Sequence, residues 1–167
     1  MLETLKAAGI RARMDDSDNS MGWKCAQWEM KGVPVRLELG PRDIENGQCV
    51  CVRRNDFEKI TVALDELTER VPEILEQVQQ GLYDKAKKNL DEHIFAAGSL
   101  EEAKAIQEEH GGFIKTMWCG DLACEMAMKE QAGMTSRCIP FVQEHLGDTC
   151  ACCGKPASSM VIWGVAY

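Results

Sequence analysis

Two closely spaced cysteine pairs most constrain how this chain of 167 residues can fold. Cys150 and Cys153 are separated by two residues and followed by Gly154, which permits a tight turn that directs backbone amides toward a bound metal. Cys119 and Cys124 are separated by four residues, which is a weaker signal taken alone. Four thiolates on two short hairpin-like pieces suit a structural Zn²⁺ ion.

The other cysteines leave two alternatives open. Cys152 adjoins Cys153 and could replace a neighbouring ligand, although only Cys150 and Cys153 have the two-residue gap that wraps one metal. A redox dithiol is the competing interpretation, but it needs a thiol at a helix N-terminus, and Gly-Lys-Pro after Cys153 is a poor helix start. The remaining four are read as small hydrophobic residues in strands or at their edges: Cys25, Cys49, Cys51 and Cys138.

Composition and charge limit where the protein works and what it binds. Nine cysteines, without an N-terminal basic stretch and apolar segment, predict a soluble cytoplasmic protein that does not cross a membrane. The formal charge of −8 argues against a surface coated in phosphate-binding groups. Residues 23–54, however, hold six basic and four acidic residues, a balance of +2, whereas residues 61–110 hold five and twelve, a balance of −7. If nucleic acid binds, we expect it on the first part.

Hydrophobic periodicity predicts an α/β fold that begins with a small mixed sheet. We expect a helix from Leu2 to Ala8 and then a strand at residues 10–14. This order normally continues a βαβ unit whose first strand lies upstream, so we expect an N-terminally truncated domain. The missing strand would leave an exposed sheet edge that favours self-association. Alternation from Val33 to Leu39 turns Arg36 away from the apolar face, and Gly40-Pro41-Arg42 reads as the turn that ends this strand. Further expected elements are a helix at 23–30 and strands at 48–53 and 59–64.

The second half of the chain begins with a long amphipathic helix, because apolar residues recur every three or four positions from Leu67 to Ile94. Ser99 and Glu102 form a capping box for another helix, which ends at His110 before two glycines. The rest predicts strands at 113–118, 136–141 and 160–167 and a helix at 122–131. We place the truncated sheet domain at residues 1–64, and the linker helix with a zinc-stapled α/β domain at 65–167.

The run GWKCAQWEMKGVPVRLELGPRD at residues 22–43 closely resembles the anticodon-binding domain of prolyl-tRNA synthetases of the archaeal and eukaryotic-like type. The likeness continues in WCG at 118–120, CIPF at 138–141 and CGKPA at 153–157, and so covers almost the entire chain. It implies an anticodon-binding domain followed by a C-terminal domain with structural zinc, which has no open position for catalysis. The zinc ligands that it implies are Cys119, Cys124, Cys150 and Cys153.

The resemblance also implies which residues read RNA. An arginine fork can engage O6 and N7 of guanine, while the N1 and N2 hydrogens need a carboxylate. The family commonly has an aromatic residue where Cys25 stands, and Trp28 could stack on a base instead, although packing is the simpler interpretation. Without the resemblance, the charged residues would be read as surface ion pairs. The positions that read the two guanines shared by proline anticodons fall on Glu29, Arg36, Arg42 and Asp43.

We therefore predict a piece of a proline-tRNA ligase, active in protein synthesis, that recognises the anticodon of proline tRNA beside a catalytic domain. The sequence shows no glycine-rich ATP motif and no nucleophile with an adjacent base, so we expect no catalysis by this chain alone and ATP only in the absent catalytic domain. A free-standing tRNA-binding module and a zinc-stapled interaction protein are the alternatives, and a homodimer is left open. Tyr167 matches a terminal tyrosine of the family, or is simply a final strand residue.

Overall fold

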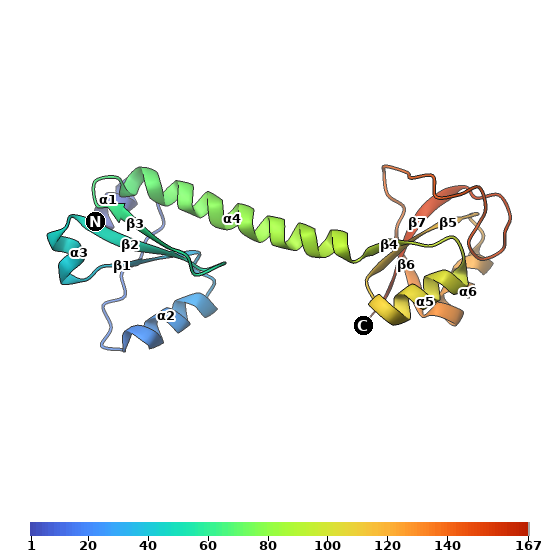
Figure 1. Cartoon of the computed structure of the whole chain (residues 1–167), viewed down its shortest axis with the longest axis horizontal. Coiled ribbons are helices and arrows are strands. Elements are labelled where there is room, and N and C mark those ends of the chain that lie inside the picture. Colours follow the sequence, from blue (N-terminus) through green and yellow to red (C-terminus); the bar gives the residue numbers. More distant parts are fainter. Residues whose placement is uncertain (167) are drawn as a thin grey trace. The chain divides into compact units, whose positions relative to one another are not determined.

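The computed structural model describes residues 1–166, which divide into two compact units, residues 1–86 and 87–166 (Figure 1). The division lies inside the long helix α4 (Leu67–Glu92). Each unit combines one sheet with helices, so the expected α/β class is confirmed. The functional boundary that we placed at residues 64 and 65 stays a prediction, and Tyr167 lies outside the described residues.

The first unit contains a three-stranded antiparallel sheet in the order β1 (Val35–Glu38), β2 (Gln48–Arg53) and β3 (Lys59–Ala63). The sheet is antiparallel where a mixed one was expected, and the expected strand at residues 10–14 is irregular backbone. Ile10 and Ala12 nevertheless pack against the core. Their alternation therefore indicated burial, which does not require pairing in a sheet.

Four helices surround this sheet: α1 (Leu2–Ala7), α2 (Met21–Met30), α3 (Pro41–Glu45) and the start of α4. The expected turn at Gly40 to Arg42 is instead the start of α3, since Pro41 fits the first helical position and the Asp43 carboxylate accepts the Gly40 amide. The core lies between the sheet and α4, and α2 covers the opposite face (Figure 1). The buried residues of this core are Leu5, Cys49, Cys51, Val62, Leu67, Val71 and Ile74.

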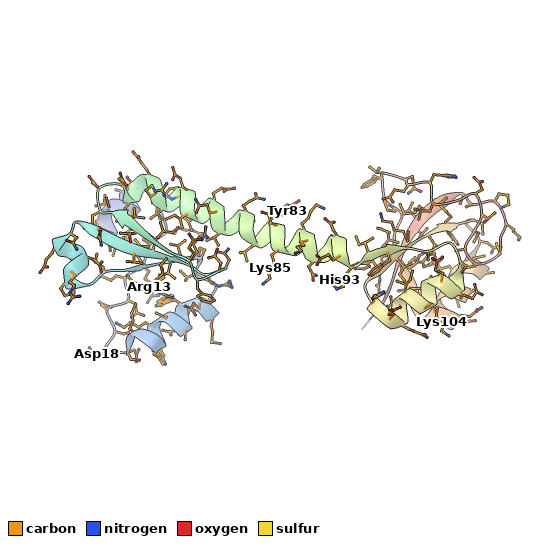
Figure 2. The ribbon with its side chains drawn as sticks, viewed as in Figure 1. Arg13, Asp18, Tyr83, Lys85, His93 and Lys104 are labelled. Atoms are coloured by element: carbon orange, nitrogen blue, oxygen red, sulfur yellow. The ribbon has the colours of Figure 1, made fainter. Side chains whose placement is uncertain are left out.

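Beyond this core, α4 is a solvated helix. Every residue from Leu82 to Glu92 is exposed, and Figure 2 shows Tyr83 and Lys85 projecting from the helix. Ion pairs four residues apart, Lys87 with Asp91 and Lys88 with Glu92, support this stretch. None of the described helices is long and apolar enough to cross a membrane.

The second unit contains a mixed four-stranded sheet in the order β4 (Ile94–Ala96), β5 (Phe113–Trp118), β7 (Ser159–Val165) and β6 (Met134–Cys138). β4 is parallel to β5, and the other pairs are antiparallel. The helices α5 (Leu100–His110) and α6 (Leu122–Ala132) contribute to one core with the sheet. Ile94, expected at the end of the long helix, instead opens β4, because the His93 carbonyl accepts a hydrogen bond from the Phe113 amide at 2.8 Å.

Candidate functional site

The first sheet has one face on the core and one charged face. In the β1–β2 register Arg36 lies opposite Val52, and Arg54 follows two residues later with its amide bonded to the Pro34 carbonyl at 2.9 Å. Because side chains alternate along a strand, Arg36 and Arg54 share a face, away from the buried Cys51. We call the following set the charged face: Glu29 from α2, Arg36, Glu38 and Lys59 from the sheet, and Arg54 from the turn that follows β2.

Arg36 is held between two carboxylates on the charged face. Its Nη1 donates to Glu29 Oε1 at 2.5 Å, and its Nε donates to Glu38 Oε1 at 2.9 Å. The three side chains are between 23% and 30% exposed, so the arginine is half-buried. Burial works against the charge of Arg36, but the hydrogen bonds to Glu29 and Glu38 outweigh it and raise the pKa of the guanidinium. Arg36 and Glu29 thus form the ion pair that the alternative interpretation expected.

Arg42 and Asp43 lie on α3, the short helix that follows β1. Arg42 is exposed, while Asp43 is half-buried and its Oδ2 accepts the Gly40 amide at 2.9 Å. Among the described residues, no hydrogen bond or ion pair joins either of them to Glu29 or Arg36. The structure therefore brings two of the four expected RNA-reading residues into contact and places the other two on the neighbouring helix.

Trp28 is engaged by protein groups on its edge and over its ring. The indole Nε1 donates to Asp15 Oδ2 at 2.6 Å. Hydrogen bonds from the Ser17 side chain and from Trp28 lower the pKa of Asp15 to about 2. Lys31 Nζ lies 4.4 Å and Arg13 Cζ 5.2 Å from the ring centroid, which are cation–π distances. A base stacking on Trp28 would have to displace one of these cations.

A shallow recess opens beside the Glu29–Arg36 pair. Glu29, Arg36 and Arg54 contribute polar groups to its wall, and the Arg54 Nε donates to the Glu29 carbonyl at 3.1 Å. Sequence reasoning missed Arg54. The signal that could have found it is the strand register, which pairs residues far apart in the chain. The remaining lining residues are Trp28, Val33 and Val52.

In the second unit four cysteine sulfurs converge, and all lie within 4.8 Å of one another. The Cys119 Sγ is 3.7 Å from the sulfurs of both Cys124 and Cys153. Tetrahedral ligation with Zn–S bonds of ~2.3 Å requires sulfur–sulfur separations of about 3.8 Å. The cluster can therefore hold a metal ion of this size. We call it the thiolate cluster: Cys119, Cys124, Cys150 and Cys153.

Two different local structures position these sulfurs. Cys119 follows β5 and Cys124 lies in the first turn of α6, so this pair sits on a strand-to-helix turn where a hairpin was expected. Cys150 and Cys153 lie on a hairpin-like turn. The Gly154 amide bonds to the Cys150 carbonyl at 3.0 Å, and Gly154 has a φ of +70°, which glycine adopts without strain.

The pKa values of these thiols show that the cluster requires a positive charge before all four can ionise. Burial and the neighbouring thiols raise the pKa of Cys124 far above its usual range. Burial also opposes ionisation of Cys150, but the backbone amides of Cys152, Cys153 and Cys119 outweigh it and lower its pKa to about 7. A divalent cation would supply the positive charge that lets all four thiols ionise together.

Cys152 and the redox alternative can be examined on the same geometry. Cys152 is half-buried against the core, and its thiol donates to the Cys124 carbonyl at 3.4 Å. Burial and the negative charges of Cys150 and Cys153 raise its pKa to about 11. Cys124 is the thiol at a helix N-terminus, but its pKa is raised. A reactive dithiol needs a lowered pKa at a helix N-terminus, and the thiol whose pKa is lowered, Cys150, lies on the hairpin-like turn and not at a helix N-terminus.

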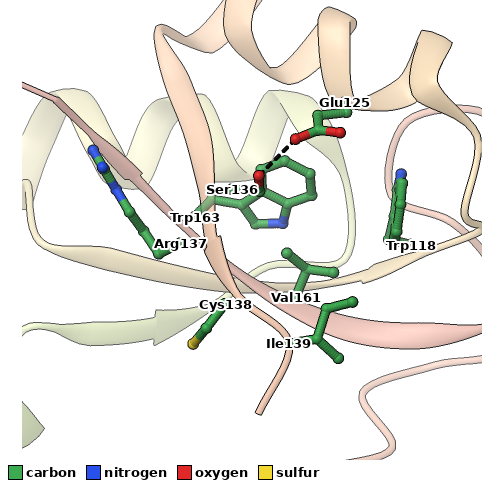
Figure 3. Close-up of a pocket in the computed structure, with 8 residues that line it drawn as sticks. All are labelled: Trp118, Glu125, Ser136, Arg137, Cys138, Ile139, Val161 and Trp163. Carbon is green, nitrogen blue, oxygen red and sulfur yellow. Dashed lines mark hydrogen bonds between the residues drawn. The ribbon is translucent and has the colours of Figure 1, made fainter.

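A separate cavity of about 160 Å³ lies beside β6 (Figure 3). The Ser136 hydroxyl donates to the Glu125 carboxylate at 2.6 Å, which links β6 to α6, and Figure 3 shows the Trp163 indole beside this pair. The indole nitrogens of Trp118 and Trp163 already donate to the Asp121 carbonyl and the Thr116 hydroxyl. None of the expected site residues lines this cavity.

Comparison with known proteins agrees with this division of the chain. The family model "Anticodon binding domain" matches residues 1–74, and "Prolyl-tRNA synthetase, C-terminal" matches residues 100–167. A proline--tRNA ligase of Lachnospira eligens is 53% identical over 99% of this chain and 34% of its own length, and one of Clostridium novyi is 53% identical over 94% and 33%. The chain thus spans about a third of the length of the curated relatives it matches.

A solved structure gives the same result. The crystal structure of prolyl-tRNA synthetase from Cryptosporidium parvum, complexed with L-proline and AMP, is 33% identical with a TM-score of 0.91, and the match covers 99% of this chain and 36% of that one. The chain therefore consists of an anticodon-binding domain followed by a second, smaller α/β domain. It belongs to the prolyl-tRNA synthetase family, and its two domains are those of the family's C-terminal region.

Proposed function

We propose that this chain is the anticodon-reading part of a proline--tRNA ligase and that it recognises the guanines shared by proline anticodons. The observation that carries the proposal is the Arg36 guanidinium, held against Glu29 on the charged face of an anticodon-binding domain. A guanine presents acceptors to an arginine and N–H donors to a carboxylate. Glu29 and Arg36 therefore offer both halves of the required pattern, already positioned against each other.

Arg42 and Asp43 are proposed as the partners of the second guanine. Arg42 is exposed on α3, and Asp43 uses one carboxylate oxygen, Oδ2, for the Gly40 amide. A carboxylate can accept from a base at its other oxygen while it keeps the capping bond. Exposed loop bases are the part of an RNA that proteins usually read by sequence.

Catalysis is proposed to take place in a partner domain. The relatives are about three times as long as this chain, and they are named proline--tRNA ligases. We infer that ATP and proline bind in a catalytic domain that acts with this chain in the cytoplasm. The purified chain alone should give no proline-dependent pyrophosphate exchange, and measurable exchange would contradict this inference.

A structural Zn²⁺ ion is proposed for the thiolate cluster. The support is the donor set of four thiols and the 3.7 Å separations of the Cys119 sulfur from those of Cys124 and Cys153, which suit tetrahedral zinc. Four protein ligands leave no position for substrate or water, so this metal would hold the second unit together without a part in catalysis.

The anticodon proposal is tested by binding the chain to proline tRNA and to the same tRNA with its two shared anticodon guanines replaced by adenine. We expect at least a tenfold preference for the guanines, and Arg36→Ala should remove about 1–3 kcal/mol of it. Arg70→Ala is a matched control, since Arg70 pairs with Glu73 on α4 away from the charged face. Equal affinity for the two tRNAs would refute the proposal.

A further inference from the structure

The cations of the charged face are not equally neutralised. Arg36 contacts the carboxylates of both Glu29 and Glu38, and Lys59 Nζ lies 3.7 Å from Glu38. The Arg54 guanidinium donates instead to a neutral group, the backbone carbonyl of Glu29. Among the residues that the structure describes, no carboxylate forms an ion pair with Arg54. Arg54 is therefore the uncompensated positive charge of this face.

The position of Arg54 is fixed by two hydrogen bonds. Its amide donates to the Pro34 carbonyl at 2.9 Å, which extends the β1–β2 pairing, and its Nε donates to the last turn of α2 at 3.1 Å. A guanidinium has five N–H donors in a planar fork, and this contact uses the one on Nε. Within the described residues the two terminal amino groups have no hydrogen-bond partner. They belong to a half-buried side chain in the wall of the recess that holds Glu29 and Arg36.

We propose that Arg54 binds a phosphodiester group of the anticodon loop, next to the base that Glu29 and Arg36 read. The proposal rests on the anticodon-reading function. A fork with free paired donors and a net positive charge matches two oxygens of one phosphate. The carboxylates around Arg36 neutralise its charge and leave it to donate to the acceptors of a base, whereas Arg54 supplies positive charge. In a chain with a formal charge of −8, an uncompensated cation in the recess also offsets repulsion of RNA.

A purely structural role for Arg54 makes a different prediction. A basic side chain that bonds the last carbonyls of a helix caps its C-terminus, as Arg54 does for α2. If Arg54 only caps α2, its substitution lowers the melting temperature, but the variant and the native chain release the same number of counterions when they bind RNA. A phosphate contact, by contrast, contributes to the salt dependence of the dissociation constant and is indifferent to base sequence.

The test measures binding of the full chain to an RNA hairpin with the proline anticodon, and to its guanine-replaced form, between 50 and 200 mM salt. Arg54→Gln should reduce the slope of log Kd against log salt by about 0.7 for both RNAs, so its loss of affinity is roughly 2.6-fold greater at the lower salt. Arg54→Lys, which keeps the charge, should retain the slope. Arg53→Gln is the matched control, because Arg53 lies on the opposite face and pairs with Asp56 and Glu58.

The outcomes separate this inference from the anticodon function. An unchanged slope in Arg54→Gln, with the guanine preference of the native chain intact, would overturn the phosphate contact and leave the anticodon function standing. A reduced slope in a chain without guanine preference would support the contact and refute anticodon reading. Loss of guanine preference at an unchanged slope would make Arg54 a base-reading residue, contrary to the proposal, and absence of RNA binding would refute both.

Discussion

The charged face of the first unit and the thiolate cluster of the second are held by opposite electrostatic arrangements. On the charged face, Arg36 lies between Glu29 and Glu38, so the charges of these three residues satisfy one another before a ligand arrives. In the thiolate cluster, like groups converge within 4.8 Å and cannot all ionise without a cation. The first arrangement suits a surface that exchanges its partners for a ligand. The second suits a site whose ion completes the fold.

The pKa shifts of the two sites express the same contrast. The pKa values of Arg36 and Cys124 are both raised, but the shift favours the charged form of the arginine and the neutral form of the thiol. The Arg36 shift comes from hydrogen bonds to carboxylates that outweigh burial, and the Cys124 shift comes first from burial. At Cys150, by contrast, burial is outweighed by backbone amides, which lower the pKa. The four thiols therefore need a metal to become anionic together, whereas the charged face holds its charges without one.

Metal removal should have the largest effect, because it should unfold one of the two units and leave the other folded. A structural zinc contributes on the order of 10–16 kcal/mol, so chelation or Cys150→Ser should unfold the second unit and leave the first unit folded. Hydrogen exchange followed by mass spectrometry resolves the two units, and metal analysis should find one zinc per chain. Cys138→Ser is the control, since Cys138 is an exposed thiol of the same unit outside the cluster. Unchanged exchange in residues 113–165 after verified metal removal would count against a structural metal.

A core substitution should act on the first unit alone. Ile74 is fully buried between α4 and the sheet, so Ile74→Ala should cost about 2–5 kcal/mol of the unfolding free energy of that unit, measured in urea. The bound metal should be retained, because the thiolate cluster lies in the other unit. Leu82→Ala on the same helix is the control, as Leu82 is 42% exposed. A comparable loss with Leu82→Ala would show that the measured effect does not come from the core.

Local patterns predicted most elements of the fold. The strands at 48–53 and 113–118 and the helix at 100–110 occur with the expected bounds, because alternation, a Ser99 cap and two glycines are all local signals. β4 was missed, because its short parallel pairing depends on Phe113, a partner far along the chain. Helix α3 was missed because Gly-Pro reads equally well as a turn or as a helix start.

The same distinction applies to the candidate sites. The spacing of Cys150, Cys153 and Gly154 is local, and it indicated a metal-binding turn directly. The contact between Glu29 and Arg36 joins a helix to a strand, and the two residues were singled out for RNA reading only through the family resemblance. Arg54 carries no local signal, because its place beside Arg36 follows from the β1–β2 register. Site residues that strand pairing brings together therefore have to be identified from the structure, whereas site residues within a single turn can be identified from the sequence.

The smallest expected effect comes from Asp15, whose charge should contribute slightly to the stability of the first unit. Bonds from Ser17 and Trp28 lower its pKa from an ordinary 3.8 to about 2. A depressed pKa stabilises the fold above the unfolded value, and this contribution is lost as the pH falls from 3.8 toward 2. Asp15→Asn should therefore slightly lower the melting temperature of the first unit at pH 7, and the difference from the native chain should shrink below pH 4.

The readout for Asp15→Asn must follow the first unit alone, because thiolate ligands also take up protons in acid and release their metal. Hydrogen exchange in residues 13–31 meets this requirement, since the segment holds Asp15, Trp28 and the two cations over its ring. Asp16→Asn is the matched control for the loss of one charge. If Asp15→Asn changed nothing at pH 7, the negative charge of Asp15 would add no stability, and its bonds to Ser17 and Trp28 would serve to position the Trp28 ring.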